Sequence, residues 1–371
     1  MNIQSAPEID SLIDANAPVA IGVSGGKDSQ AAALSTFAYL DKRGHKGERI
    51  LIHSDLGSVE WSESLPVCER LAAHLKCELV VVKRKAGDLM DRWEARWQSS
   101  LRRYINLETV TLVLPWSTPS MRFCTSELKT HIIEAELKRR FKNQPFINVT
   151  GVRRDESAAR ANGTIANKTK KGNWNWRPIS DWSVDHVFGC ISVSGMDPHE
   201  AYTKFNMSRV SCMFCIMSNW KDLVAAASQE ESHSLLKRIV NLEVISSFGF
   251  QGNRWLADVA PHLLGDDLML AVSEAKQKAI ARVELEKQIT KSMLYEKGWP
   301  VRMLTDEEAA ILVRVRSGVS LLLGIQAKYL TVEEVHARYA ELIEIKHAKE
   351  EAKLKKSKVK PGAITELVMV L

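Results

Sequence analysis

The sequence predicts an α/β fold: a parallel, twisted sheet with helices on both faces, followed by a mostly helical C-terminal region. Short apolar runs alternate with helical patterns through the first half of the chain, which is typical of a parallel sheet. A glycine-rich turn joins the first apolar run to a helical pattern. Beyond residue 220 only helical patterns continue. We therefore expect two regions, 1–220 and 221–371.

The order of the expected elements places the candidate site. Strands are expected over 19–23, 49–53, 78–82 and 146–150. Helices are expected between and after them, over 30–40, 59–75, 88–104, 126–141 and 185–191. In the C-terminal region, helices are expected over 222–240, 266–292, 306–316 and 332–356. Because ligands of parallel sheets lie outside the carboxyl ends of the strands, the polar segments that follow the strands are the candidate site.

The segment Ser24–Ser29 reads Ser-Gly-Gly-Lys-Asp-Ser and joins the first strand to the first helix. Such a turn before a helix is a common phosphate-binding geometry, because glycines let the backbone approach the anion and free N–H groups point at it. Ser24 and Ser29 add hydroxyl groups, and Lys27 adds a positive charge. The alternative is a glycine turn without a ligand.

Two other phosphate-binding motifs do not fit this loop. A Walker A loop requires glycine where Ile21 stands, and serine or threonine where Asp28 stands. The dinucleotide-binding pattern requires glycine where Ser24 stands. The loop therefore predicts a phosphate site of a different class.

A second candidate segment, Gly151–Ser157, follows the fourth strand and reads Gly-Val-Arg-Arg-Asp-Glu-Ser, with Arg160 soon after it. The adjacent Arg153 and Arg154 can hold a phosphate or a sulfate through forked, charge-assisted hydrogen bonds. The alternative is a pair of surface arginines on a loop.

Two aspartates near strand ends, Asp28 and Asp55, are candidate ligands for Mg²⁺ on a nucleotide, because hard oxygen ligands suit this ion. Asp55 can equally cap the turn that follows it. Lys129 is a candidate phosphate contact, and a surface lysine on an amphipathic helix is the alternative.

The order of five motifs resembles the phosphoadenosine phosphosulfate (PAPS) reductase family, within the PP-loop ATP pyrophosphatase superfamily. The motifs are Ser-Gly-Gly-Lys-Asp-Ser at 24–29, Arg-Phe-Cys-Thr at 122–125 with Leu128-Lys129, the double-arginine segment at 151–157 with Arg160, Pro-Ile-Ser-Asp-Trp at 178–182, and Cys-Met-Phe-Cys at 212–215. The resemblance covers residues 18–219 and implies a Rossmann-like sheet of the adenine nucleotide α-hydrolase type. The family includes PAPS and APS reductases, the ATP sulfurylase small subunit, DndC-like proteins of DNA phosphorothioation and phage defence, and CysH-like proteins of some CRISPR loci.

The resemblance implies an enzyme that cleaves ATP, bound with Mg²⁺, to AMP and pyrophosphate. It activates an acceptor by adenylation, for sulfur transfer in nucleic-acid modification or defence. Implied catalytic residues are Lys27, Asp28 and Arg154. The implied nucleotide-binding residues are Ser24, Gly25, Gly26, Lys27, Asp28, Ser29, Asp55, Lys129, Gly151, Arg153, Arg154 and Arg160.

Two alternatives remain open. The first is a sulfonucleotide (PAPS or APS) reductase, although reductases of this family usually have a degenerate loop and a catalytic cysteine in a C-terminal tail, whereas no cysteine follows Cys215 here. The second is a non-catalytic, nucleotide-binding accessory subunit of a CRISPR or defence complex.

The cysteines divide into two groups. Cys212 and Cys215 form a Cys-x-x-Cys pair, which suits redox chemistry, zinc or an iron–sulfur cluster. The resemblance adds Cys124, where APS reductases place a cysteine pair, so these three residues are candidate ligands of a [4Fe–4S] cluster or of zinc. The alternative is three unligated thiols. Cys190 or another group is a candidate fourth ligand. Cys68 and Cys77 are expected to be buried as small apolar side chains.

Composition restricts compartment and partners. No apolar run approaches the ~20 residues that span a bilayer, and residues 1–18 lack the pattern of a signal peptide. The six cysteines in 371 residues indicate a reducing compartment, so we expect a cytoplasmic protein without membrane contact. The net charge of +6 suits a nucleotide, and permits nucleic acid or a larger protein complex as partner.

Two basic segments have alternative interpretations. Residues 167–177 mix basic side chains with Trp174 and Trp176, which predicts either contact with single-stranded nucleic acid or a flexible active-site flap. The C-terminal lysines predict either a solvated helix end or a phosphate-binding arm. They are Lys353, Lys355, Lys356, Lys358 and Lys360.

Overall fold

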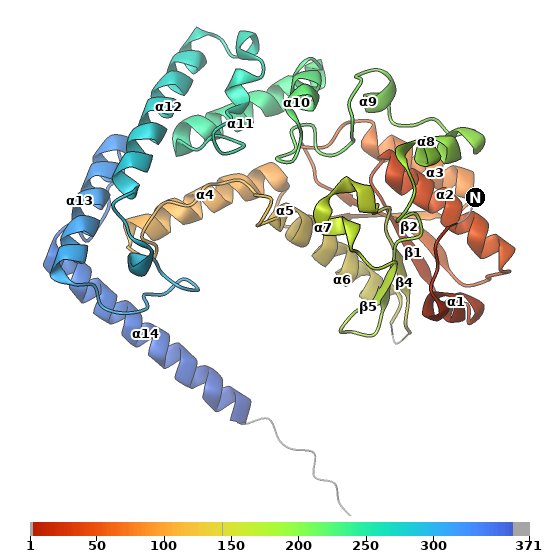
Figure 1. Ribbon diagram of the computed structural model, residues 1–371, viewed down its shortest axis with the longest axis horizontal. Coiled ribbons are helices and arrows are strands. Elements are labelled where there is room, and N and C mark those ends of the chain that lie inside the picture. Colours follow the sequence, from red (N-terminus) through yellow and green to blue (C-terminus); the bar gives the residue numbers. More distant parts are fainter. Residues whose placement is uncertain (1–2, 143, 359–371) are drawn as a thin grey trace, which may run out of the picture. The chain divides into compact units, whose positions relative to one another are not determined.

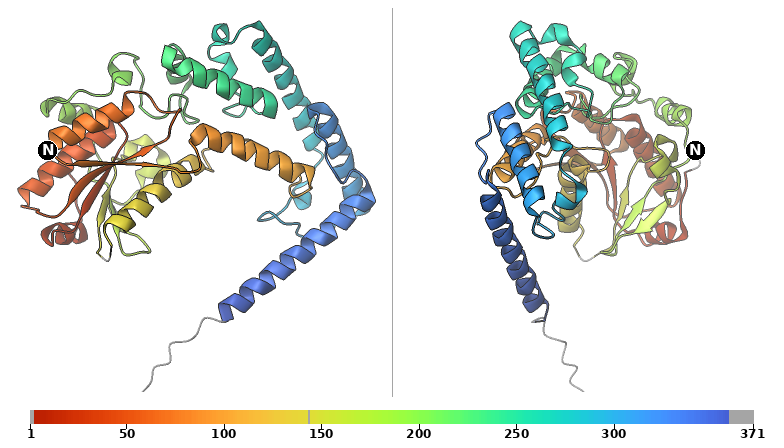
Figure 2. Two further views of the ribbon diagram at one scale, coloured as in Figure 1. Left: turned by 180° about the vertical axis from the view of Figure 1, so that it is seen from behind. Right: turned by 60° about the vertical axis from the view of Figure 1, so that its left-hand side comes forward.

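The computed structural model describes residues 3–142 and 144–358 (Figures 1 and 2). They form two compact units, each made of segments that are discontinuous in sequence. Unit 1 comprises Met1–Glu94, Trp116–Val244 and Gly249–Val272, and unit 2 comprises Ala95–Pro115, Ile245–Phe248 and Ser273–Leu371, each in its described part. The expected division at residue 220 stays a prediction.

Unit 1 contains a six-stranded sheet with the strand order β3-β2-β1-β4-β6-β5. All neighbouring strands are parallel except the edge pair of β5 and β6, which is antiparallel. The strands are β1 (Val19–Val23), β2 (Arg49–Asp55), β3 (Glu78–Lys83), β4 (Ile147–Val149), β5 (Ala166–Lys168) and β6 (Trp174–Trp176). The four predicted strands are confirmed, and the sheet is mostly parallel as expected.

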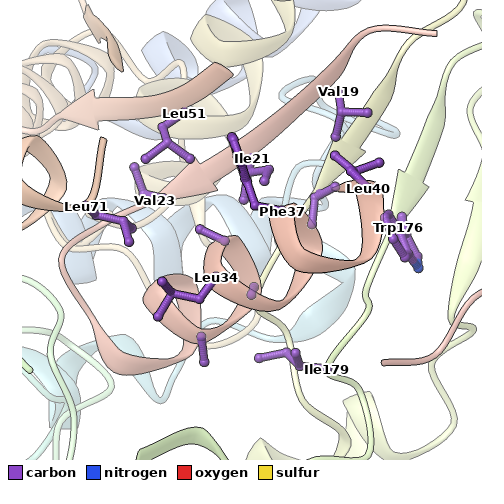
Figure 3. Packing of buried hydrophobic residues seen from close by; sticks show 14 of the residues in the cluster. Val19, Ile21, Val23, Leu34, Phe37, Leu40, Leu51, Leu71, Trp176 and Ile179 are labelled. Atoms are coloured by element: carbon purple, nitrogen blue, oxygen red, sulfur yellow. The ribbon is translucent and has the colours of Figure 1, made fainter. Parts of the chain in front are cut away.

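Helices cover both faces of the sheet because alternate residues of β1 point to opposite sides. Val19, Ile21 and Val23 pack in a cluster with α1, α2, α3 and α8. Figure 3 shows these strand residues with Leu34, Phe37 and Leu40 of α2 and Leu71 of α3. Ala20 packs in a second cluster with Leu137 of α6 on the other face. The helices of unit 1 include α1 (Pro7–Asp14), α2 (Lys27–Lys42), α3 (Ser64–Leu75), α5 (Phe123–Thr125), α6 (His131–Arg140), α7 (Ala158–Ala161), α8 (Val184–Val193), α9 (Glu200–Thr203), α10 (Trp220–Ala227) and α11 (His233–Ser246). A π-helical turn, Ser126–Thr130, precedes α6.

The basic segment 167–177 does not present Trp176 for stacking on nucleic acid, and the flap alternative stays a prediction. It forms the hairpin of β5 and β6, and Trp176 is fully buried. The Trp176 ring lies 5.9 Å from the ring of Tyr39, and its indole N–H donates to the carbonyl of Gln4. Trp176 therefore belongs to the core. The prediction missed these strands because three residues give too little alternation to identify a strand.

The expected helix over 222–240 is wrong, because two helices occupy this region. Helix α10 ends at Ala227 and α11 begins at His233. Between them, Gln229 is extended, with φ −97° and ψ 127°. The Ser232 hydroxyl donates to the carbonyls of Ala226 and Gln229. This serine adds side-chain hydrogen bonds at the break, where the same carbonyls also accept the N–H groups of Gln229 and Ser232.

The helical pattern expected towards the C-terminus is confirmed, with shifted ends. The helices are α12 (Asp266–Glu286), which runs from unit 1 into unit 2, α13 (Asp306–Leu323) and α14 (Val332–Lys358). Helix α13 extends beyond the expected Arg316 and ends at Gly324, whose φ of +67° suits a helix C-cap. Among the described residues, no helix has both the length and the apolar character needed to cross a membrane. Lys360 of the lysine cluster lies outside them.

The core of unit 2 holds the end of helix α4 (Leu89–Ile105). Arg316 is fully buried and donates to the carbonyls of Tyr104 (2.9 Å), Ile105 (3.4 Å) and Lys328 (2.6 Å). Arg338 donates to the next carbonyl of the chain, Asn106 (3.1 Å). The last carbonyls of a helix have no partner within the helix and carry its negative dipole end. The two arginines add charged donors at this helix end, where the carbonyls of Tyr104 and Ile105 also accept the N–H groups of Leu107 and Lys328.

Replacing Arg316 is expected to destabilise the protein. The Arg316→Met variant removes three hydrogen bonds to carbonyls. Those of Tyr104 and Ile105 keep the N–H groups of Leu107 and Lys328, whereas that of Lys328 has no other donor among the described residues. An unpaired carbonyl costs about 1–3 kcal/mol, and we expect urea unfolding to show a loss of this size. Arg314→Met is the matched control, because Arg314 is exposed and its one side-chain hydrogen bond within the described residues goes to Gln288. Its stability should stay within about 0.5 kcal/mol of the wild type. Equal losses in both variants would contradict this role of Arg316.

Candidate functional site

The loop Ser24–Ser29 lies between the end of β1 and the start of α2, at the carboxyl edge of the sheet. Gly25 has a φ of +72°, and a Cβ there would lie 2.9 Å from the carbonyl oxygen of Ser64, so the position requires glycine. The Ser29 hydroxyl is used within the loop, since it accepts from Ser24 N–H and donates to the Gly26 carbonyl. Within residues 3–142 and 144–358, the N–H groups of Gly25 and Gly26 have no acceptor. They are available to an anion.

Asp28 lies between two cations. Lys27 Nζ is 2.7 Å from one carboxylate oxygen of Asp28, and Arg153 Nε is 2.6 Å from the other. Arg153 is 4% exposed and also contacts Asp155 and the carbonyl of Trp182. The structure thus brings the double-arginine segment to the glycine loop, with Arg153 as an internal link. Gly151 permits this approach, because a Cβ there would lie 2.4 Å from the Asp28 carbonyl oxygen.

Arg154 points elsewhere, into a pocket of about 380 Å³ at the carboxyl edge of β4 and β6. The pocket is also lined by Arg160 and Arg177. Arg154 pairs with Asp181 at 2.5 Å, and Arg160 pairs with Glu156. Arg177 donates only to uncharged groups, the Thr164 carbonyl and Asn167 Oδ1.

Arg177 makes this pocket electropositive, since it has no carboxylate partner among the described residues. Burial lowers the pKa of Arg177, and repulsion from Arg160 adds to the effect. A phosphate or sulfate would relieve both. The sequence analysis missed Arg177 because the strand it follows, β6, was not predicted.

The candidate magnesium ligands are both engaged by cations. Asp55 accepts the N–H of Gly57 at 2.7 Å and pairs with Lys83 at 3.1 Å. Burial alone would raise the pKa of Asp55, but these two contacts lower it overall. The capping alternative for Asp55 is therefore what the structure has. Since Asp28 is also paired, neither aspartate fits a metal site in this arrangement, and magnesium binding stays a prediction.

The three candidate metal-binding cysteines lie in one region. Burial raises the pKa of the Cys212 thiol, and Cys215 and Cys124 raise it further, while Lys129 opposes the rise. Lys129 therefore lies near these thiols, and its expected contact with phosphate stays a prediction. Within the described residues, however, no three histidine, cysteine or acidic side chains form a group that could hold a metal. The arrangement does not fit a cluster as it stands, and the ligand set stays a prediction.

The remaining cysteines lie elsewhere. Cys190 of α8 is buried in the core against α2, with its sulfur 4.0 Å from the Ala31 carbonyl oxygen. Cys68 is buried as expected, whereas Cys77 is half-buried. Burial raises the pKa of Cys190 and of Cys77 to about 11. Such thiols are poor nucleophiles at neutral pH.

Sequence reasoning assigned no role to His199, which supports the glycine loop from beneath. Its ring is fully buried and would lie 3.3 Å from a Cβ on Gly25. His199 Nδ1 accepts the N–H of Ala201, and Nε2 lies 3.4 Å from the Ser64 hydroxyl oxygen. Because Nδ1 accepts, we assign the ring proton to Nε2, and His199 is neutral. Its position depends on contacts across 135 residues of sequence, which no local pattern reveals.

The stability of the protein is expected to depend on pH through His199. Burial lowers the pKa of His199, although Glu63 opposes this. In the unfolded chain His199 takes up a proton near pH 6.5, whereas in the folded chain it does so only at a lower pH. The free energy of unfolding therefore decreases as the pH falls below about 6.5. His199→Asn keeps an acceptor for Ala201 but cannot titrate. We expect unfolding free energies, measured between about pH 7 and 5, to fall more steeply for the wild type than for His199→Asn. Parallel curves would contradict this assignment.

Comparisons with known proteins add the family. The model of the phosphoadenosine phosphosulfate reductase domain matches residues 18–218. A search of curated proteins finds no match. One similar solved structure is the PAPS reductase of Candida auris in its phosphate complex, with 12% identity, 57% of this chain and 98% of that chain covered, and a TM-score of 0.35.

Two further structures are similar in part. The U34-tRNA thiolase NcsA of Methanococcus maripaludis, with its [4Fe–4S] cluster, has 13% identity, 70% and 88% coverage of the two chains and a TM-score of 0.36. The NH₃-dependent NAD synthetase of Campylobacter jejuni subsp. jejuni, in complex with the nitrate ion, has 16% identity, 74% and 92% coverage and a TM-score of 0.28. The family match spans more than half of the chain and includes the glycine loop, the double arginine and the Cys-x-x-Cys pair. The chain therefore belongs to the phosphoadenosine phosphosulfate reductase family, a family of nucleotide-binding, sulfur-related enzymes.

Proposed function

We propose that this protein is an ATP pyrophosphatase-type enzyme that adenylates an acceptor. The observation that carries the proposal is the intact Ser-Gly-Gly-Lys-Asp-Ser loop at the N-terminus of the 16-residue helix α2, with the N–H groups of Gly25 and Gly26 open to an anion among the described residues. The positive end of the helix dipole favours phosphate at this place.

In the proposed reaction, a nucleophilic atom of the acceptor attacks the α-phosphorus of ATP. The bond from this phosphorus to the bridging oxygen breaks, and pyrophosphate leaves with the electron pair. A sulfide then attacks the activated atom of the acceptor, and AMP leaves with the electron pair of the bond that breaks. The glycine loop would hold the leaving pyrophosphate through preorganised N–H groups, which stabilise charge without reorganisation. Lys27 would add its charge by exchanging Asp28 for a phosphate oxygen.

Arg154, Arg160 and Arg177 provide a second place for an anion, in the pocket of about 380 Å³. We propose that this pocket holds a phosphate or sulfate of the nucleotide or the acceptor. ATP is expected to enter with Mg²⁺, which reduces the charge of its phosphates. We propose that the acceptor belongs to a nucleic acid, or to a larger defence complex, in the cytoplasm. The net charge of +6 suits such a partner.

Sulfonucleotide reduction is the second candidate, and the electropositive arginine pocket favours it, because forked arginine contacts suit a sulfate as well as a phosphate. In that case a thiol reductant, and no ATP, would be consumed. A nucleotide-binding accessory subunit is the third candidate. It would bind ATP without turnover.

Release of pyrophosphate from ATP distinguishes the candidates. We expect slow release by the wild type, and a loss of about 100-fold or more in Lys27→Ala, since a lost electrostatic contact to the leaving group costs this much. Lys42→Ala, at the other end of α2, is the matched control and should release pyrophosphate at the wild-type rate. ATP binding without release would favour the accessory subunit instead. Sulfite formation from PAPS or APS would favour the reductase.

The proposed iron–sulfur ligands are tested on anaerobically purified protein. We expect iron and acid-labile sulfide in the wild type, and their loss in Cys124→Ala, because three thiolates are the fewest that hold such a cluster with one open iron. Cys77→Ala is the control, since Cys77 is a half-buried thiol that packs against the core cluster of Val19, Ile21 and Val23. Zinc in place of iron, or protein without either metal, would contradict the cluster.

A further inference from the structure

A tyrosine from a distant part of the sequence contacts the glycine loop. Tyr202 lies on α9, 175 residues from Lys27. Its hydroxyl oxygen accepts the N–H of Lys27 at 3.2 Å and the N–H of Val210 at 3.1 Å. The Lys27 N–H is one of the first N–H groups of α2, which have no acceptor within the helix. The phosphate-binding geometry would direct these groups at a ligand. Tyr202 therefore occupies the edge of the expected anion site.

The Tyr202 hydroxyl uses its oxygen as an acceptor and leaves its donor hydrogen without a partner among the described residues. A phenol oxygen has two acceptor sites and one donor hydrogen. Lys27 and Val210 take both acceptor sites. Within the described residues, no acceptor receives the hydroxyl hydrogen. The hydrogen must therefore point away from both N–H groups.

The Tyr202 hydroxyl lies beside the glycine loop. A Cβ on Gly26 would lie 3.6 Å from the Tyr202 hydroxyl and 3.7 Å from the Ser24 hydroxyl, so both hydroxyls border the same glycine. Ser24 is exposed. The ammonium group of Lys27 lies 5.7 Å from the centre of the Tyr202 ring, and the ring of Phe188 supports it edge-on at 5.5 Å. Lys27 and Phe188 thus contact the ring, and its hydroxyl lies beside Gly26.

The tyrosine stays protonated under physiological conditions. Burial raises the pKa of Tyr202 to about 12, although the N–H groups of Lys27 and Val210 oppose the rise. A neutral phenol donates a hydrogen bond, whereas a phenolate would repel an anion.

We propose that the Tyr202 hydroxyl is a direct ligand of the anion in the glycine loop and donates its hydrogen to an oxygen of a diphosphate or triphosphate chain. The inference rests on the proposed function and names a contact within the same site. The phenol would add a fourth donor to the N–H groups of Gly25 and Gly26 and the Ser24 hydroxyl. Through its bonds to Lys27 and Val210, it also connects the start of α2 to the segment that carries Cys212.

Binding of inorganic pyrophosphate to the full chain, measured by calorimetry, tests the proposal. Tyr202→Phe keeps the ring and removes the donor. We expect affinity to fall about tenfold or more, the usual effect of one hydrogen bond to a charged group. Tyr39→Phe is the matched control, because the Tyr39 hydroxyl donates to Asp10, away from the loop, and its affinity should equal that of the wild type.

A second variant separates ligand contact from support of the loop. Fluorotyrosine at position 202 makes the hydroxyl a stronger donor and a weaker acceptor. As a ligand of the anion, it should bind pyrophosphate about twofold more tightly than the wild type. As mere support for Lys27 and Val210, it should bind no more tightly.

The outcomes are distinguishable. A wild type that binds neither pyrophosphate nor ATP would overturn the proposed function together with this inference. A wild type that binds pyrophosphate, with unchanged affinity in Tyr202→Phe or no gain with fluorotyrosine, would overturn this inference alone. Weaker binding by Tyr202→Phe with tighter binding by the fluorotyrosine protein would support both.

Discussion

The candidate site depends on one buried guanidinium. Arg153, at 4% exposure, contacts Asp28 of the glycine loop and Asp155 of its own segment. Placing a cation in the interior is costly unless it is paired and hydrogen-bonded. Arg153 meets this requirement because its carboxylate partners come from two different strand ends. The same contacts fix the loop after β1 against the loop after β4, so both candidate motifs are held by one side chain.

The two adjacent arginines have different tasks for this reason. Since Arg153 turns inward to Asp28, Arg154 turns to the pocket with Arg160 and Arg177. A substitution of Arg153 would therefore disturb two anion-facing places at once, whereas one of Arg154 would disturb only the pocket. Unit 2 uses the same chemistry differently. There Arg316 is buried without a carboxylate partner in the described part of the chain and is satisfied by carbonyls at the end of α4.

The sequence supported the features that local patterns encode. The apolar runs predicted β1 to β4, and the loop after β1 was identified because its residues are contiguous. Strands β5 and β6 have three residues each, too few for a periodic signal. Arg177 was missed with them. Tyr202 and His199 reach the loop through contacts between residues far apart in sequence. Asp55 shows a third limit, since a carboxylate at a strand end suits both a metal and a turn, and only the contacts of its oxygens distinguish them.

The paired state of Asp28 explains how the loop can hold its charges both with and without a ligand. Its two oxygens are divided between Lys27 and Arg153. In the proposed reaction Lys27 would move to a phosphate oxygen and Asp28 would keep Arg153, so this partly buried carboxylate would not be left unpaired. The exchange replaces one charge-assisted contact of Lys27 with another, and its cost is correspondingly small. If Asp28 were paired with Lys27 alone, the same movement would leave a partly buried charge without a partner, which is unfavourable. In the proposed reaction, Arg153 would therefore make Lys27 available to the ligand without leaving Asp28 unpaired.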